Sequence, residues 1–137
     1  MKYLAIDLGE KRIGLATSDT NGVISQPFLS FQRKSDTEAI DRISQICTKE
    51  NIDRIVLGIP YSASESNQKR FYSFKEKLEK SLETTVETWD ETFSTKQAQN
   101  MVAFSDAVPE RRRTNKHRDD VAAAIILQEY LDNEKRT

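Results

Sequence analysis

The stretch that decides the fold is residues 3–18, Tyr-Leu-Ala-Ile-Asp-Leu-Gly-Glu-Lys-Arg-Ile-Gly-Leu-Ala-Thr-Ser. Residues 3–6 are a short apolar run closed by Asp7 and Gly9, a pattern typical of a buried strand. Residues 12–18 predict a second strand. Asp7 therefore has its backbone held by a strand and its side chain placed where the sheet opens to solvent. It is the first candidate for a functional residue, with a turn as the alternative role.

The next part of the chain predicts an antiparallel meander. Residues 20–22, Thr-Asn-Gly, suit a tight hairpin turn. Residues 23–31 then predict a third strand. Pro27 lies inside it and cannot donate a hydrogen bond to a neighbouring strand, so we expect this strand at an edge of the sheet.

The rest of the chain alternates between helices and strands. A Ser-x-x-Glu pattern at Ser35 and Glu38 predicts the start of a helix, with Cys47 among the apolar residues of its buried face. The later elements are expected, in order, as a strand over 54–59, a polar loop over 61–69, a helix over 71–82, a strand over 85–89, a helix that starts at Ser94 or Thr95, a basic loop over 110–118 and a final helix over 119–133.

This order of elements predicts an α/β fold. We expect a five-stranded mixed sheet, in which a three-stranded antiparallel meander is joined by parallel strands and flanked by helices. The length of 137 residues fits a single domain over residues 1–137. Charged residues make up 31% of the chain and apolar residues 36%, which favours a folded, polar globular protein over a disordered one.

Charge and cysteine content limit the classes of function. The formal net charge is −1, so no overall basic field marks a nucleic-acid-binding protein. Residues 110–118 nevertheless hold five cations, which are Arg111, Arg112, Arg113, Lys116 and Arg118. Cys47 is the single cysteine and cannot form an internal disulfide, which favours a reducing compartment. No apolar run approaches the roughly 20 residues that cross a bilayer, so we expect a cytoplasmic protein away from membranes.

Two further acidic pairs stand at ends of predicted elements. Asp90-Glu91 follows the strand over 85–89, and Asp119-Asp120 opens the final helix. Successive side chains of a strand point to opposite faces, so only one acid of the first pair can join Asp7. For both pairs the alternative role is the favourable charge that acids provide at a helix N-terminus.

Converging acids at these three places would need a cation. Two carboxylates about 4 Å apart repel each other by roughly 4 kcal/mol at an effective dielectric of about 20. Oxygen ligands with open positions suit Mg²⁺ or Mn²⁺, which activate water and stabilise the attacking and leaving oxygens of a phosphoryl transfer. The sequence shows no cysteine and histidine cluster for zinc, and His117 is expected in a solvated loop. The acids therefore predict a site for one or two Mg²⁺ or Mn²⁺ ions.

The motifs, taken in order, resemble those of one family. The matching stretches are 6–19 (Ile-Asp-Leu-Gly-Glu-Lys-Arg-Ile-Gly-Leu-Ala-Thr-Ser-Asp), 56–60 (Val-Leu-Gly-Ile-Pro), 89–95 (Trp-Asp-Glu-Thr-Phe-Ser-Thr) and the closing helix from Asp119. They resemble the YqgF family, also called RuvX, of Holliday junction resolvase-like pre-16S rRNA nucleases. The resemblance covers nearly the whole chain. It implies an RNase H-like fold and processing of the 5′ end of precursor 16S rRNA in the bacterial cytoplasm.

The resemblance also implies roles for single residues. Asp7, Glu91 and Asp119 stand at the positions of the family's acidic triad, as catalytic residues and metal ligands. There are two departures from the family's motifs. Thr92 stands where the family has an arginine after Asp-Glu, and the loop after Pro60 lacks the family's Asn-Met-x-Gly-Thr pattern.

Three functions stay open at this point. In the first, a metal-dependent endonuclease cuts structured precursor rRNA and binds its backbone with Lys11, Arg12 and the cations of 110–118. In the second, the same chemistry acts on branched DNA, a four-way junction, which requires a dimer because two symmetric strands are cut. In the third, a non-catalytic RNA-binding factor of ribosome assembly or transcription retains the acids. We expect a monomer or a weak homodimer.

Overall fold

The computed structural model describes residues 1–91 and 119–135. Within them the strands are β1 (Tyr3–Leu8), β2 (Arg12–Ser18), β3 (Ser25–Gln32), β4 (Arg54–Ile59) and β5 (Val86–Asp90). The helices there are α1 (Asp36–Lys49), α2 (Glu65–Leu82) and α5 (Asp119–Lys135). The helix expected from Ser94 or Thr95 and the basic loop over 110–118 lie outside the described residues.

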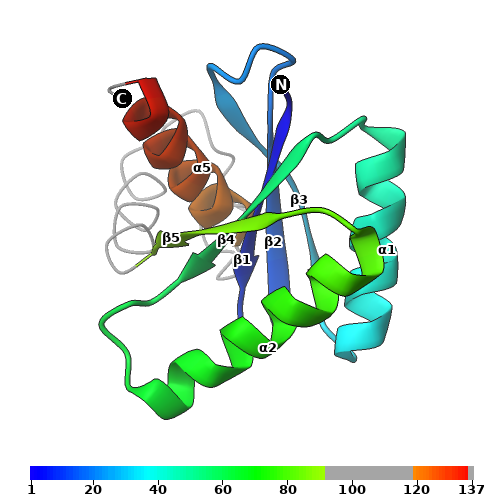
Figure 1. Ribbon diagram of the computed structural model, residues 1–137, viewed down its shortest axis with the longest axis vertical. Coiled ribbons are helices and arrows are strands. Elements are labelled where there is room, and N and C mark those ends of the chain that lie inside the picture. The colour runs from blue at the N-terminus through cyan, green and yellow to red at the C-terminus, as the bar shows by residue number, and fades with distance from the viewer. Residues whose placement is uncertain (92–118, 136–137) are drawn as a thin grey trace, which may run out of the picture.

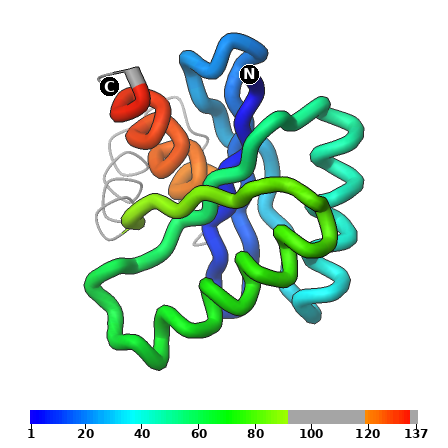
Figure 2. The backbone as a smooth tube through the Cα atoms, in the orientation of Figure 1, coloured from blue at the N-terminus to red at the C-terminus, as the bar shows by residue number. Residues whose placement is uncertain are grey.

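These strands form one five-stranded mixed sheet in the order β3-β2-β1-β4-β5. β1 pairs antiparallel with β2, and β2 with β3, whereas β4 pairs parallel with both β1 and β5. Figures 1 and 2 show α5 on one side of the sheet and α1 and α2 on the other. The predicted architecture is confirmed. Pro27 lies on the edge strand β3, next to a shift of register between Leu15 and Ala16.

The central strand β1 meets a different core on each face. Leu4, Ile6 and Leu8 are fully buried in the core that α1 and α2 cover. Ala5 belongs to a second core, which α5 covers with small and aliphatic residues. Because side chains alternate along a strand, Asp7 points to the same face as Ala5, toward α5.

The predicted start of α1 is confirmed. Ser35 is the N-cap residue, and its Oγ accepts a hydrogen bond of 3.1 Å from the backbone N–H of Glu38. Such a bond satisfies one of the N–H groups that the first turn leaves without a helical partner. Cys47 is half-buried and packs against the core that α1 and α2 cover.

Two strand boundaries differ from the expectation by two residues, and the end of β3 and both ends of β5 differ by one. β1 continues to Leu8, so Asp7 lies inside the strand rather than just after it. β3 begins at Ser25 rather than at residue 23. The reason is the Asp19 carboxylate, which accepts the N–H groups of Val23 and Ile24 at 2.7 and 2.9 Å and keeps both residues in the turn.

The polar loop expected over 61–69 is wrong from Glu65 onward, because α2 begins there. Ser64 caps the helix, and its Oγ accepts from the backbone N–H of Asn67 at 3.4 Å. The first turn is mostly exposed and carries polar residues, so no apolar periodicity marks it. Periodicity begins only where Phe71 and Phe74 reach the core.

Candidate active site

Asp7 lies on the central strand between two glycines. In the register of the sheet it is paired with Gly14 of β2 and with Gly58 of β4. Residues paired across neighbouring strands direct their side chains to the same face. Both glycines therefore leave space on either side of Asp7 on the face toward α5, and two of the predicted acids occupy that space.

Asp119 lies against the first of these glycines. A Cβ at position 14 would clash with the backbone carbonyl group of Asp119, so the start of α5 can approach β2 this closely only at a glycine. Asp119 is thereby brought near Asp7, and its charge contributes to the raised pKa of Asp7. Oδ2 of Asp119 also lies 3.8 Å from Nε of Arg12.

Glu91 lies against the second glycine. A Cβ at Gly58 would lie 2.9 Å from Oε2 of Glu91. The neighbouring Asp90 is engaged elsewhere, because its Oδ1 accepts the backbone N–H of Tyr61 at 3.2 Å. Of the acidic pair at the end of β5, the structure thus brings Glu91 next to Asp7, in agreement with the expectation that one acid of the pair can join it.

The electrostatics of the site favour protonated carboxyls. Burial is the largest cause that raises the pKa of Asp7 well above its ordinary value, and Glu91 adds to it through its charge and a hydrogen bond. Burial also raises the pKa of Glu91, against the opposing charge of Arg70. Oε2 of Glu91 is buried and has no hydrogen-bond partner. Without a bound cation, the site disfavours the ionised form of both acids.

A divalent cation fits this pair of acids. Asp7 and Glu91 offer hard oxygen donors, and the unpartnered Oε2 of Glu91 is free to become a ligand. Mg²⁺ is commonly held by one or two carboxylates together with water and substrate phosphates. Within residues 1–91 and 119–135, no three acidic, histidine or cysteine side chains are grouped closely enough to hold a metal ion. Asp119 lies beside Arg12 at the edge of this pair, and its charge acts on Asp7.

Arg70 of α2 is a neighbour of the site that the sequence analysis missed. Its Nη1 donates to the carbonyl oxygen of Gly9 at 3.4 Å and its Nη2 to that of Leu8 at 3.5 Å. Its charge lowers the pKa of both Asp7 and Glu91. The capping serine Ser64 is the signal that could have placed Arg70 on a helix, but its position at the end of β1 depends on how α2 packs.

The cations that were predicted to bind the nucleic-acid backbone lie in different surroundings. Lys11 is exposed in the turn between β1 and β2. Arg12 donates to Oγ of Ser30 at 3.2 Å and lies near Asp119, so part of its charge is used within the protein. The cations predicted from the basic loop, and His117 with them, lie outside the described residues.

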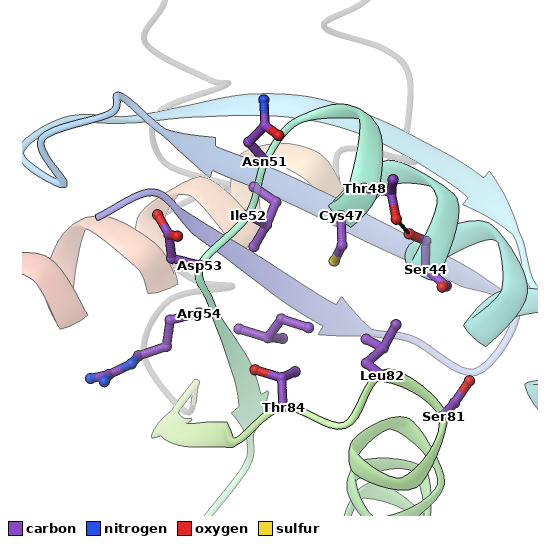
Figure 3. Close-up of a pocket in the computed structure, with 11 residues that line it drawn as sticks. Ser44, Cys47, Thr48, Asn51, Ile52, Asp53, Arg54, Ser81, Leu82 and Thr84 are labelled. Carbon is purple, nitrogen blue, oxygen red and sulfur yellow. Dashed lines mark hydrogen bonds between the residues drawn. The ribbon is translucent and has the colours of Figure 1, made fainter.

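A cavity of about 540 Å³ lies at the opposite end of the sheet (Figure 3). It opens between the ends of α1 and α2, near Arg54 at the start of β4, whereas Asp7 is paired with Gly58 near the end of that strand. Cys47 directs its sulfur into the cavity (Figure 3). Burial raises the pKa of this thiol to about 11, so it stays protonated and is a poor nucleophile at neutral pH. The cavity therefore contributes no reactive group to the acidic site.

Comparison with known proteins identifies the family. Residues 1–133 match the family model RuvX, described as a Holliday junction resolvase. The chain belongs to the RuvX family. This membership makes it a nuclease-family protein, whose class of reaction is the hydrolysis of phosphodiester bonds. Within the described residues, none of the RuvX helices has the length and apolar character needed to span a bilayer.

Curated relatives of this RuvX chain match it over nearly their whole length. One from Caldanaerobacter subterraneus subsp. tengcongensis, named "Putative pre-16S rRNA nuclease", is 34% identical over 140 residues and both chains are covered completely. One of the same name from Fusobacterium nucleatum is 36% identical over 142 residues, with 98% of this chain and 99% of the relative covered.

Solved structures show the same fold at low sequence identity. The resolvase of Fowlpox virus in complex with Holliday junction DNA is 15% identical, with a TM-score of 0.60 and coverage of 98% of this chain and 99% of that one. RuvC of T. thermophilus with a Holliday junction substrate is 14% identical, with a TM-score of 0.59 and coverage of 98% and 96%. The expected RNase H-like fold is confirmed.

Proposed function

We propose that this RuvX protein is a metal-dependent endonuclease that cleaves precursor 16S rRNA in the maturation of its 5′ end. The observation that carries the proposal is the pair of buried Asp7 and half-buried Glu91, which lie side by side in the space that Gly14 and Gly58 leave open. The relatives named for this substrate support the choice of RNA. A cytoplasmic location is part of the proposal.

In this proposal two of the acids bind metal and the third lies at the edge of the site. Asp7 and Glu91 hold one or two Mg²⁺ or Mn²⁺ ions, and Asp119 at the rim is the third acidic group. A bound divalent ion supplies Lewis-acid stabilisation of the phosphoryl oxygens and a stronger water nucleophile. Burial of Asp7 excludes bulk water from one side of the site, which strengthens its electrostatic interactions.

The cations have the complementary task of positioning nucleic acid. Lys11, Arg12 and the basic segment 110–118 bind backbone phosphates, which fixes the register of the substrate without reading its sequence. Arg12 lies beside Asp119 and would link phosphate binding to the position of that acid. The protein acts on RNA as a single domain, as a monomer or weak homodimer.

The test uses the full chain on precursor 16S rRNA and on a four-way DNA junction, with Mg²⁺, Mn²⁺ or EDTA. We expect ion-dependent cleavage of the RNA that Asp7→Asn abolishes while RNA binding is retained. Asp41→Asn, on an exposed part of α1, is the matched control and should cleave normally. Retained cleavage by Asp7→Asn would contradict the proposal. Absent cleavage with salt-sensitive RNA binding intact would favour a non-catalytic RNA-binding factor.

A branched DNA substrate is the second candidate. The description of the family model favours it, and the structural neighbours bound to junctions have the same fold. A junction resolvase needs two active sites to cut two strands symmetrically. Cleavage of the junction by a dimer, with the RNA left intact, would select this function over the first.

A further inference from the structure

Arg70 lies at the end of β1, next to the part of the strand that carries Asp7. It belongs to α2, which covers the face of the sheet opposite α5, yet its guanidinium reaches the backbone at the end of β1. The carbonyl groups it meets, of Leu8 and Gly9, directly follow Asp7 in the chain. A cation at this place faces the same end of the strand from which the Asp7 site opens.

The guanidinium is held in position but its donors are only weakly used. Its carbon lies 4.5 Å from the centroid of the Phe71 ring, and Phe71 is itself buried. Its two hydrogen bonds, at 3.4 and 3.5 Å, are at the long limit for N–H···O bonds. A guanidinium carries five N–H groups, so Arg70 keeps capacity for a stronger acceptor.

Arg70 also differs from three of the four other arginines in the described part of the chain, and it is half-buried whereas the fourth, Arg42, is exposed. Arg12, Arg33 and Arg54 each lie within 4 Å of a carboxylate oxygen. No ion pair joins Arg70 to a described carboxylate, although its charge acts on both Asp7 and Glu91. An arginine that is half-buried, stacked on a ring and without an ion-pair partner among the described residues is suited to bind an anion that arrives with the substrate.

We propose that Arg70 binds the scissile phosphate beside Asp7 and Glu91. This inference rests on the proposed nuclease function and adds a residue to its site. A planar guanidinium can donate two parallel hydrogen bonds to a phosphate, which positions it and stabilises the charge that develops during cleavage.

The experiment compares Arg70→Gln and Arg70→Lys with the matched control Arg42→Gln. Arg42 of α1 also stacks on a phenylalanine ring at 4.5 Å, that of Phe31, so its loss removes the same charge and the same kind of contact away from the acids. For each variant we would measure single-turnover cleavage, the thermal midpoint, and the salt dependence of RNA binding in EDTA.

We expect Arg70→Gln to slow the single-turnover rate by about 10² to 10³-fold, as loss of a charge-stabilising donor does. The slope of log binding constant against log salt should fall by about 1, because one phosphate contact is lost. Arg70→Lys should restore the slope but only part of the rate, since an ammonium cannot form the paired bonds. Arg42→Gln should leave rate and slope unchanged.

The inference would be overturned if Arg70→Gln had an unchanged salt slope and lost rate only in proportion to the loss of folded protein that its lower thermal midpoint indicates. Arg70 would then have a structural role at the end of β1. The slope also separates the two proposals. If the wild-type chain cleaves neither RNA nor junction, the nuclease function fails. In that case a salt slope lower than that of wild type in Arg70→Gln would still identify a phosphate contact of Arg70. A slope equal to that of wild type would show that Arg70 makes no such contact.

Discussion

The two faces of the sheet are built from side chains of very different size. On the face toward α1 and α2, the strands present large aliphatic residues such as Leu4 and Leu57, which are fully buried. On the face toward α5 they present Ala5, Gly14 and Gly58, with Asp7 among them. Large side chains bury apolar area and stabilise the fold, whereas the small ones leave room for acids. The comparison teaches that both faces bury an apolar core, but that the candidate acids lie on the face whose strands present small side chains.

The largest effect on stability should come from the apolar face. Leu57→Ala removes a fully buried side chain, so we expect the free energy of unfolding to fall by about 2–5 kcal/mol. Cleavage below the new melting temperature should stay within a few-fold of wild type. Urea unfolding with a cleavage assay at low temperature checks both. A large loss of rate in the folded variant would show that the two faces are not separable.

The next effect should come from the glycine under α5. Gly14→Ala places a Cβ against the backbone of Asp119, so α5 must shift at its first turn. We expect a stability loss of about 1–3 kcal/mol and a loss of cleavage that exceeds that of Leu57→Ala. The matched control is Ala5→Gly on the same face, which adds no atoms. Normal cleavage by Gly14→Ala would mean that the position of Asp119 is not needed.

The third prediction concerns pH in the absence of metal. Because the pKa of Asp7 is raised in the folded state, the folded chain binds more protons than the unfolded chain above the ordinary carboxyl pKa. Stability in EDTA should therefore fall as pH rises from the ordinary carboxyl range through the raised pKa. The slope for one proton is at most about 1.4 kcal/mol per pH unit.

Asp7→Asn is the variant that checks this third prediction. It should flatten the pH dependence and be at least as stable as wild type near neutral pH, because a buried carboxylate is removed. Added Mn²⁺ should stabilise wild type, by about 2.7 kcal/mol at a hundredfold excess over the dissociation constant, and leave Asp7→Asn unchanged. Equal pH profiles for the two proteins would contradict the assigned environment of Asp7.

The smallest effect should come from the cap of α1. Ser35→Ala removes the hydrogen bond to Glu38 and should cost about 1 kcal/mol of stability. The rate of cleavage should not change, because α1 lies on the face away from the acids. Thermal melts with single-turnover assays measure both. Ser35→Thr, which keeps the hydroxyl, should restore the stability.

Local patterns made most of the fold predictable. Short apolar runs, the turn at Gly22, Pro27 and the cap at Ser35 each act within a few residues, and the structure has elements where they predict them. The sequence did not predict the first turn of α2, because its polar residues face solvent. Residues that face solvent do not show the helical spacing of apolar side chains. Arg70 was missed with that turn.

For the site, the sequence by itself determined which acids were available and, through alternation along β5, that only one of Asp90 and Glu91 could join Asp7. It also determined that glycines stand at positions 14 and 58. Only the tertiary structure decided that these glycines flank Asp7 in the sheet, that Asp119 also approaches Arg12, and that Arg70 reaches the end of β1. The physical reason is that strand register and helix packing join residues far apart in the chain, which no local pattern encodes.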